Sequence, residues 1–285
     1  MHSSILSDLN PQQKAAVTYD NGPLLVLAGA GSGKTKVLTN RVAYFINKGL
    51  CLPENCLLLT FTNKAAKEMV ARMEKLLENA GLPAETSVKA GTFHSLCAKI
   101  LRIDGGTIGI PPGFLIYDEQ DQKSLVKEII ENLGYATDSY REAASSAYNP
   151  AAILSVISDA KNQMLTPIQY SEFVNREFQQ VVFKVYSEYE KRLKETGALD
   201  FDDLLIKAVL LLKGNSEILK KWQDKFTHIF VDEWQDTNKI QYTLTKLLVG
   251  SRKNITAVGD ASQSIYSWRG ADYKNINYLI KDYPD

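Results

Sequence analysis

The chain has 285 residues, of which 45% are hydrophobic, so it can bury a sizeable core in one large domain or two smaller ones. Its 33 basic and 33 acidic side chains cancel, and this neutral total gives no support for a nucleic-acid partner, although a local basic or aromatic surface is compatible with it. Its three cysteines form no CxxC pair, which argues against a disulfide framework or a zinc site and favours reduced core residues of a cytoplasmic protein.

The first ten residues, MHSSILSDLN, lack the basic start and the long apolar stretch of a signal peptide, so we expect none. No apolar run in the sequence is long enough to span a membrane. The first strong element is the run LLVLA at 24–28, which follows the turn sequence NGP and leads into glycines. A short apolar run bounded in this way predicts a buried parallel strand, and a helix is expected to begin near Lys34.

The same pattern of strand and helix repeats along the chain. Apolar runs bounded by turn residues predict four more buried strands, at 56–59, 87–92, 228–231 and 255–258. Helices are expected over 66–80, where Gly81 is a suitable stop, and over 95–102. Strands that alternate with helices predict an α/β fold with a parallel sheet.

The stretch 105–197 breaks this alternation because its pattern is mostly helical. Apolar residues at helical spacing over 174–193 form one long face, and Gly197 ends it. We therefore predict an all-helical insertion at 105–197 inside one α/β domain, which is made of residues 1–104 and 198–285.

The glycine-rich segment is the sharpest chemical signal. A strand, a loop and then Gly33-Lys34-Thr35 at the start of a helix predict a phosphate cradle, because glycines let backbone N–H groups turn inward and a helix N-terminus adds positive potential. In this pattern Lys34 reaches the β- and γ-phosphates of ATP and Thr35 holds Mg²⁺. The residues expected to contact the nucleotide are Ala28, which replaces the usual first glycine, and Gly29, Ala30, Gly31, Ser32, Gly33, Lys34 and Thr35.

Two adjacent acids, Asp232 and Glu233, follow the strand expected at 228–231. Open α/β sheets bind ligands at the carboxyl ends of their strands, so the positive charge that these acids meet is predicted to be Mg²⁺ on a nucleotide. Asp232 would hold the metal through water, and Glu233 would orient and deprotonate the attacking water. An acidic pair alone is a weak signal, because two acids also occur at a strand end that faces solvent and binds no ligand.

Three segments together resemble motifs I, II and III of superfamily 1 DNA helicases, most closely the group of UvrD, PcrA and Rep: 28–35, 231–238 and 258–270. The resemblance covers nearly the whole chain with the motifs in order, and Ala28 is usual in this group. It implies a RecA-like P-loop NTPase domain with an inserted helical subdomain. It also implies ATP hydrolysis coupled to 3′-to-5′ movement along single-stranded DNA and at duplex junctions.

The resemblance also assigns nucleotide contacts. Gln13, in the sequence LNPQQ, would read adenine, and Lys36 stands beside the loop where arginine is common. Gln263 would sense the γ-phosphate, while Arg269 would contact it or brace the acidic pair. Asp260 would either orient its neighbours or cap a turn.

Segments 60–65 and 91–95 resemble the motifs that touch single-stranded DNA. The residues expected to contact DNA are Phe61, Thr62, Asn63, Thr92, His94, Tyr266 and Trp268. Tyr266 and Trp268 also fit this role physically, because aromatic rings on a loop beside a phosphate site can stack bases. Without the resemblance, Phe61 and Phe93 are equally compatible with core packing.

The chain departs from the family pattern at a few positions. Trp234 stands where tyrosine or phenylalanine is usual, and we expect it to pack beneath the site. Ser262 and Ser267 replace an aspartate and an arginine of motif III. In the family sequence DFDD at 200–203, the last two acids open an apolar helix, so helix capping competes with a chemical role.

The resemblance implies a second RecA-like half beyond residue 285, with arginine fingers and an adenine-stacking tyrosine. The oligomeric state and the physiological pathway are not indicated by the sequence. Two other classes of protein remain open at this point: a module that binds ATP and DNA without turnover, and part of a helicase–nuclease subunit.

Overall fold

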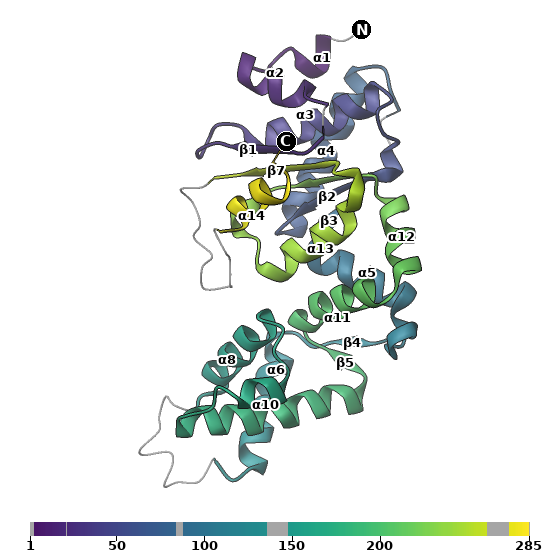
Figure 1. Ribbon diagram of the computed structural model, residues 1–285. Helices are drawn as coiled ribbons and strands as arrows, with labels where there is room; N and C mark the ends of the chain where they lie inside the picture. The colour runs from purple at the N-terminus through teal and green to yellow at the C-terminus, as the bar shows by residue number, and fades with distance from the viewer. Residues whose placement is uncertain (1–2, 21, 84–87, 136–147, 261–273, 285) are drawn as a thin grey trace. The chain divides into compact units, whose positions relative to one another are not determined.

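In the computed structural model the described residues are 3–20, 22–83, 88–135, 148–260 and 274–284. They divide into two compact units, of which one comprises Met1–Leu96 with Leu212–Asp285 and the other comprises Cys97–Leu211 (Figure 1). The expected boundaries after residues 104 and 197 stay a prediction. Within the described residues, no helix is long and apolar enough to cross a membrane.

The first unit contains a five-stranded sheet in which every neighbouring pair is parallel. In spatial order its strands are β1 (Leu24–Leu27), β7 (Ile255–Gly259), β6 (His228–Val231), β2 (Cys56–Thr60) and β3 (Lys89–Thr92). All five lie at the predicted apolar runs. Parallel strands require crossover connections, which explains the alternation of strand and helix in the sequence and confirms the α/β fold class.

Some helices of this unit pack on the sheet and others pack on neighbouring helices (Figure 1). They are α1 (Ser3–Leu6), α2 (Pro11–Thr18), α3 (Lys34–Asn47), α4 (Asn63–Asn79), α12 (Ser216–Lys225), α13 (Lys239–Val249) and α14 (Lys274–Asp282). Short 3₁₀ turns are η1 (Pro53–Asn55), η3 (Trp234–Asp236) and η4 (Gly250–Arg252). One core joins α3 and α4 to the sheet through Leu38, Met69, Leu58 and Phe230. The three cysteines are free and buried, as predicted.

Helix starts lie slightly earlier than predicted because side-chain caps set them. Thr62 accepts a hydrogen bond from the backbone of Ala65, so α4 begins at Asn63 and not near residue 66. Helix α5 (Phe93–Asp104) begins two residues before the predicted Ser95, whose backbone N–H is accepted by Thr92 Oγ1. Threonine at an N-cap satisfies an otherwise unpaired N–H of the first turn.

The second unit is mainly helical, but the prediction of an all-helical insertion was wrong in one detail. Strands β4 (Leu115–Ile116) and β5 (Ala198–Leu199) form a short parallel ladder. Two-residue strands carry no detectable alternation, and their pairing joins segments that are far apart in the sequence. The remaining elements are η2 (Gly105–Ile108), α6 (Glu119–Asn132), α8 (Pro150–Asn162), α9 (Pro167–Ser171), α10 (Glu177–Thr196) and α11 (Phe201–Gly214).

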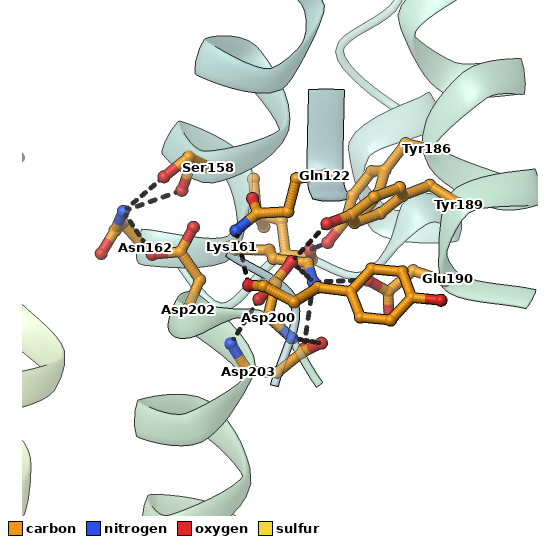
Figure 2. Close-up of polar contacts among 12 residues, drawn as sticks. Gln122, Ser158, Lys161, Asn162, Tyr186, Tyr189, Glu190, Asp200, Asp202 and Asp203 are labelled. Atoms are coloured by element: carbon orange, nitrogen blue, oxygen red, sulfur yellow. Dashed lines mark hydrogen bonds and ion pairs between the residues drawn. The ribbon is translucent and has the colours of Figure 1, made fainter. Parts of the chain in front are cut away.

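A buried cluster of charges links α8, α10 and the start of α11 (Figure 2). The ammonium of Lys161 lies 2.6 Å from Glu190, 2.7 Å from Asp200 and 3.1 Å from Asp203, and the Tyr189 hydroxyl donates to Asp200. Burial works to lower the pKa of Lys161, but the three carboxylates outweigh it and hold that pKa well above its usual value. The cluster therefore fixes three segments of the second unit to one cation.

The expectation that the two acids at 202–203 cap the following helix holds for Asp203 and not for Asp202. The cap is Asp200, whose Oδ1 accepts the backbone N–H of Asp203 at 2.8 Å. Asp203 completes the cap, because its Oδ2 accepts the backbone N–H of Asp200 at 3.4 Å, while its Oδ1 lies 3.1 Å from Lys161. Asp202 lies 3.5 Å from the amide of Asn162. A lysine 39 residues upstream of Asp200 could not be paired with these acids from sequence spacing.

Candidate active site

The glycine-rich loop connects β1 to α3 through two left-handed residues. Gly31 has a φ of 72° and Gly33 a φ of 86°, a conformation that costs glycine little. A Cβ on Gly33 would also lie 2.9 Å from Nε2 of Gln13, so the Gln13 side chain would have to move. The loop begins in the sheet, since Ala28 donates its N–H to the carbonyl of Gly259 at 3.0 Å. The conformation of the glycine-rich loop is therefore set by contacts within the protein.

Lys34 lies at the start of α3 and is almost completely buried. Its ammonium donates to the carbonyls of Ala28 at 3.0 Å and Gly29 at 3.2 Å. It also lies 3.6 Å from the carboxylate of Asp260, at the end of β7. The cation is therefore held over the loop that the sequence predicts to bind phosphates.

The next residue, Thr35, meets Asp232 from the end of β6. The Thr35 hydroxyl donates to Oδ2 of Asp232 at 3.3 Å. Burial, and next the charge of Glu233, raise the pKa of Asp232 to about 6, against the hydrogen bonds from Glu233 N–H and Thr35. A desolvated carboxylate of this kind is a group that a cation would stabilise.

This donor set fits Mg²⁺. A hydroxyl and a carboxylate are hard oxygen ligands, and Mg²⁺ usually takes one or two protein ligands and completes its shell with phosphate oxygens and water. Among the described residues, no group of three or more histidine, cysteine or acidic side chains could hold a metal ion alone. The arrangement of Thr35 and Asp232 therefore suits a metal that arrives with a nucleotide.

Glu233 leaves the strand in a left-handed conformation, with φ 51° and ψ 46°. A non-glycine residue in this region costs on the order of 1–3 kcal/mol, so its surroundings must impose it. Its N–H donates to Oδ1 of Asp232 at 3.1 Å, and its carbonyl accepts from the N–H of Asp236 at 2.9 Å. Its carboxylate accepts from Nε2 of Gln235 at 2.8 Å.

Trp234 is part of the packing, as predicted. Its side chain is fully buried, and the indole N–H donates to the carbonyl of Asn275 at 3.3 Å. The ring lies 5.7 Å from that of Tyr242, measured between centroids. An indole is tolerated in a core when its N–H finds such a partner.

A cleft of about 360 Å³ opens beside these groups. Its lining includes Thr35, Asp232 and Glu233 and also Phe61 and Thr62. Its other lining residues are Thr60, Ala65, Glu68, Met69, Arg72, Gln235 and Asp236. Residues predicted to bind the nucleotide and residues predicted to touch DNA therefore share one cleft.

The sequence matches the family described as UvrD/REP helicase N-terminal domain over residues 9–284. The chain belongs to this family. Similar curated proteins include the ATP-dependent DNA helicases PcrA of Staphylococcus aureus (strain COL) and of Staphylococcus epidermidis, each 44% identical over 283 residues. The matched region is 99% of this chain and 37% of each relative, so the chain spans about 37% of the length of these relatives.

Two residues that the family resemblance assigns to the nucleotide make protein contacts. The amide of Gln13 donates to the carbonyl of Ser32 at 2.9 Å, and its oxygen accepts from the N–H of Asn10 at 3.1 Å. Lys36 donates to the carbonyl of Asp8 at 2.6 Å. Gln13 thus ties α2 to the loop, and the roles of both residues toward adenine and phosphate stay predictions.

Of the residues predicted to touch DNA, only Phe61 and Thr62 line the cleft among those that the structure describes. The ring of Phe61 is half-buried and lies 6.2 Å from that of Phe93, which is a core residue. Asn63 is exposed, whereas Thr92 and His94 are half-buried. Four predicted site residues lie outside the described residues: Gln263, Tyr266, Trp268 and Arg269.

The sequence reasoning missed two buried residues that organise this site. Arg41 donates to Thr256 Oγ1 at 2.8 Å and to the carbonyls of Ala16, Val17 and Tyr19, where α2 ends. Gln235 contacts both the acidic turn and β7. The sequence shows a polar residue, Gln235, two positions after the acidic pair. It does not show that the partner of Gln235 is Asp260, at the end of another strand.

Proposed function

We propose that this chain is the ATP-binding portion of a UvrD/PcrA-like DNA helicase, in which ATP hydrolysis drives 3′-to-5′ movement along single-stranded DNA. The observation that carries the proposal is the convergence of Thr35 and Asp232 at 3.3 Å, with Lys34 and Glu233 adjacent to them in the chain. Membership of the UvrD/REP family and the names of the PcrA relatives support the same reading. We place this activity in the cytoplasm.

In this proposal the glycine loop binds the phosphates of ATP. Backbone N–H groups and the N-terminus of α3 would surround the β-phosphate, and Lys34 would turn from the loop carbonyls to the β- and γ-phosphates. Thr35 and Asp232 would hold Mg²⁺, which neutralises charge on the phosphate oxygens when bound. Gln13 would read adenine from its place beside Ser32.

Hydrolysis would proceed by in-line attack of a water oxygen on the γ-phosphorus. The new bond forms from that water, the bond to the β–γ bridging oxygen breaks, and ADP leaves. Glu233 would accept the proton of the attacking water; its place in the lining of the same cleft as Thr35 and Asp232 supports this role. Gln263 and Arg269 would contact the γ-phosphate, by their place in motif III.

The proposed coupling to DNA follows the order of strands in the sheet. Strands β2 and β6 are neighbours, with Leu59 paired to Val231, so the segment after β2 lies beside the acidic turn after β6. Phe61 and Thr62 belong to that segment and line the cleft. In the proposal, a structural change at the γ-phosphate would shift the residues that contact DNA. These residues also include Tyr266 and Trp268.

The proposal includes a partner for full activity. Charge builds on the γ-phosphate oxygens in the transition state, and an arginine supplied from outside the site is worth roughly 10³–10⁵ in rate. By the family resemblance, a second RecA-like half supplies it. Residues 1–285 alone are therefore expected to bind MgATP weakly and to hydrolyse it barely, with DNA giving no stimulation.

Steady-state ATPase measurements with and without a single-stranded oligonucleotide test the proposal. In the complete protein that contains this chain, DNA should stimulate turnover, and Lys34→Ala should abolish it. A protein that binds MgATP and DNA with no turnover that depends on Lys34 would instead be a binding module. Movement in the 3′-to-5′ direction is tested separately, by displacement of a labelled strand from duplexes with a 3′ or a 5′ tail.

A further inference from the structure

Gln235 is a buried polar side chain to which the proposed chemistry gives no role. Only 2% of its surface is exposed. Its Nε2 donates to Oε2 of Glu233 at 2.8 Å and to Oδ2 of Asp236 at 3.1 Å. Its Oε1 accepts from the backbone N–H of Asp260 at 2.9 Å. One amide therefore connects two acids of the turn after β6 with the end of β7.

The orientation of this amide is fixed by its partners. The N–H of Asp260 requires an acceptor, so the oxygen of Gln235 must face β7 and the nitrogen must face the two carboxylates. The contact with β7 is also close, since a Cβ on Gly259 would lie 2.8 Å from Oε1 of Gln235. The side chain therefore has one arrangement in which all its hydrogen bonds are made.

The position of Glu233 depends on a donor of this kind. Its backbone is left-handed, and the like charge of Asp236 stands next to it in the turn. Burial, and next the charge of Glu233, raise the pKa of Asp236 to about 6. Because Gln235 donates one hydrogen to each acid, its two hydrogen bonds offset part of the repulsion between them.

We propose that Gln235 is a positioning residue for the general base, which holds the carboxylate of Glu233 in place and ties it to the strand end that faces Lys34. The tie runs from Glu233 through the amide to Asp260, whose carboxylate lies 3.6 Å from the Lys34 ammonium. This inference rests on the proposed function, because it assigns a role within the same hydrolytic site.

The test uses two substitutions in the complete protein. Gln235→Met keeps the approximate size of the side chain and removes its hydrogen bonds to Glu233, Asp236 and Asp260. Gln235→Glu keeps an acceptor for Asp260, replaces the donor to the acids with a carboxylate oxygen and adds a negative charge beside Glu233 and Asp236. Both should lower kcat for DNA-stimulated ATP hydrolysis by about 10–100-fold, because misplacement of a catalytic group by about 1 Å costs this much. The KM for ATP should change by less than about threefold, because neither variant touches the glycine loop or Lys34.

A double-mutant cycle separates positioning from general damage. In a Glu233→Gln background, the Gln235 substitutions should change the residual kcat by less than about threefold, because the base that they misplace is already gone. Gln241→Met is the matched control: Gln241 is also buried and hydrogen-bonded, to Asn238 at the start of α13, but does not line the cleft. It should leave kcat within about twofold, and thermal unfolding of each variant reports any loss of fold.

The outcomes are distinct. Equal losses of kcat from Gln235→Met in the wild-type and Glu233→Gln backgrounds would overturn the positioning role, and so would an unchanged kcat in Gln235→Glu. Either result would leave the proposed hydrolytic function in place. A wild-type protein whose ATPase activity is absent, or is insensitive to Lys34→Ala, would remove the proposed function and this inference with it.

Discussion

Replacement of Lys161 by methionine tests how the second unit is held together. The lysine is 99% buried and binds three carboxylates, those of Glu190, Asp200 and Asp203. Lys161→Met keeps the apolar stem but leaves these acids without their cation (Figure 2). Loss of one partner from a buried ion pair typically costs about 3–5 kcal/mol, since the remaining charge is desolvated and unpaired. We expect a loss in that range at pH 8.

The control is a lysine–glutamate pair of the same length on the surface. Lys123 lies 2.6 Å from Glu119 on α6, the same distance as that between Lys161 and Glu190, but the side chains of Lys123 and Glu119 are both exposed. Lys123→Met should cost less than about 1 kcal/mol, because exposed pairs are screened by water and salt. The difference between the two variants reports the combined effect of burial and of the two additional carboxylates that Lys161 binds.

The assay must follow the second unit separately, because a chain with two compact units need not unfold in one step. The segment 97–211 contains no tryptophan, so tryptophan fluorescence follows the other unit. Hydrogen exchange of peptides from α8, α10 and α11 reports the second unit directly. Its thermal transition should fall by more than about 10 °C in Lys161→Met, at roughly 4 °C per kcal/mol. Equal effects of Lys161→Met and Lys123→Met would refute the reasoning from burial.

Three further predictions concern pH, the base and a buried arginine. Burial raises the pKa of Asp203 to about 7, so this acid binds its proton more tightly in the folded state than in the unfolded state. The free energy of unfolding of the second unit should therefore rise by about 1–3 kcal/mol from pH 8 to pH 5. Hydrogen exchange should show a smaller rise in Asp203→Asn. Glu233→Gln should keep the affinity for a fluorescent ATP analogue and lower kcat by about 10²–10⁴, and near-normal turnover would remove Glu233 from the role of base. Arg41→Lys should destabilise α2 by about 2–4 kcal/mol, seen as faster exchange over residues 11–18, because one ammonium cannot replace a guanidinium that donates to Thr256 and three carbonyls.

Much of the first unit could be predicted because its signals are local. Each strand is a short apolar run bounded by turn residues, and the phosphate loop needs only its own glycines and the helix that follows. The order of the strands was not predictable in the same way. Neighbours such as β1 and β7 are more than 200 residues apart, and nothing in either run specifies the other.

The connections that complete the site were also beyond the sequence. Gln235 meets Asp260 and Arg41 meets Thr256, in each case through a contact between distant segments. The same holds for Lys161 and Asp200 in the second unit. Polar residues of this kind look like surface residues in a sequence, because their spacing relative to local neighbours says nothing about a partner on another strand or helix.

The adjacent acids show why the local pattern was correct but incomplete. In a continuing strand, Asp232 and Glu233 would point to opposite faces of the sheet, because side chains alternate. Both line one cleft because Glu233 leaves the strand in a left-handed conformation, so the turn brings two successive carboxylates to the same side. That conformation is unfavourable for glutamate, and the hydrogen bonds to Asp232, Gln235 and Asp236 are what offset it. The sequence supplies the two acids proposed for the chemistry, and the residues that follow them supply the turn that brings both carboxylates into one cleft.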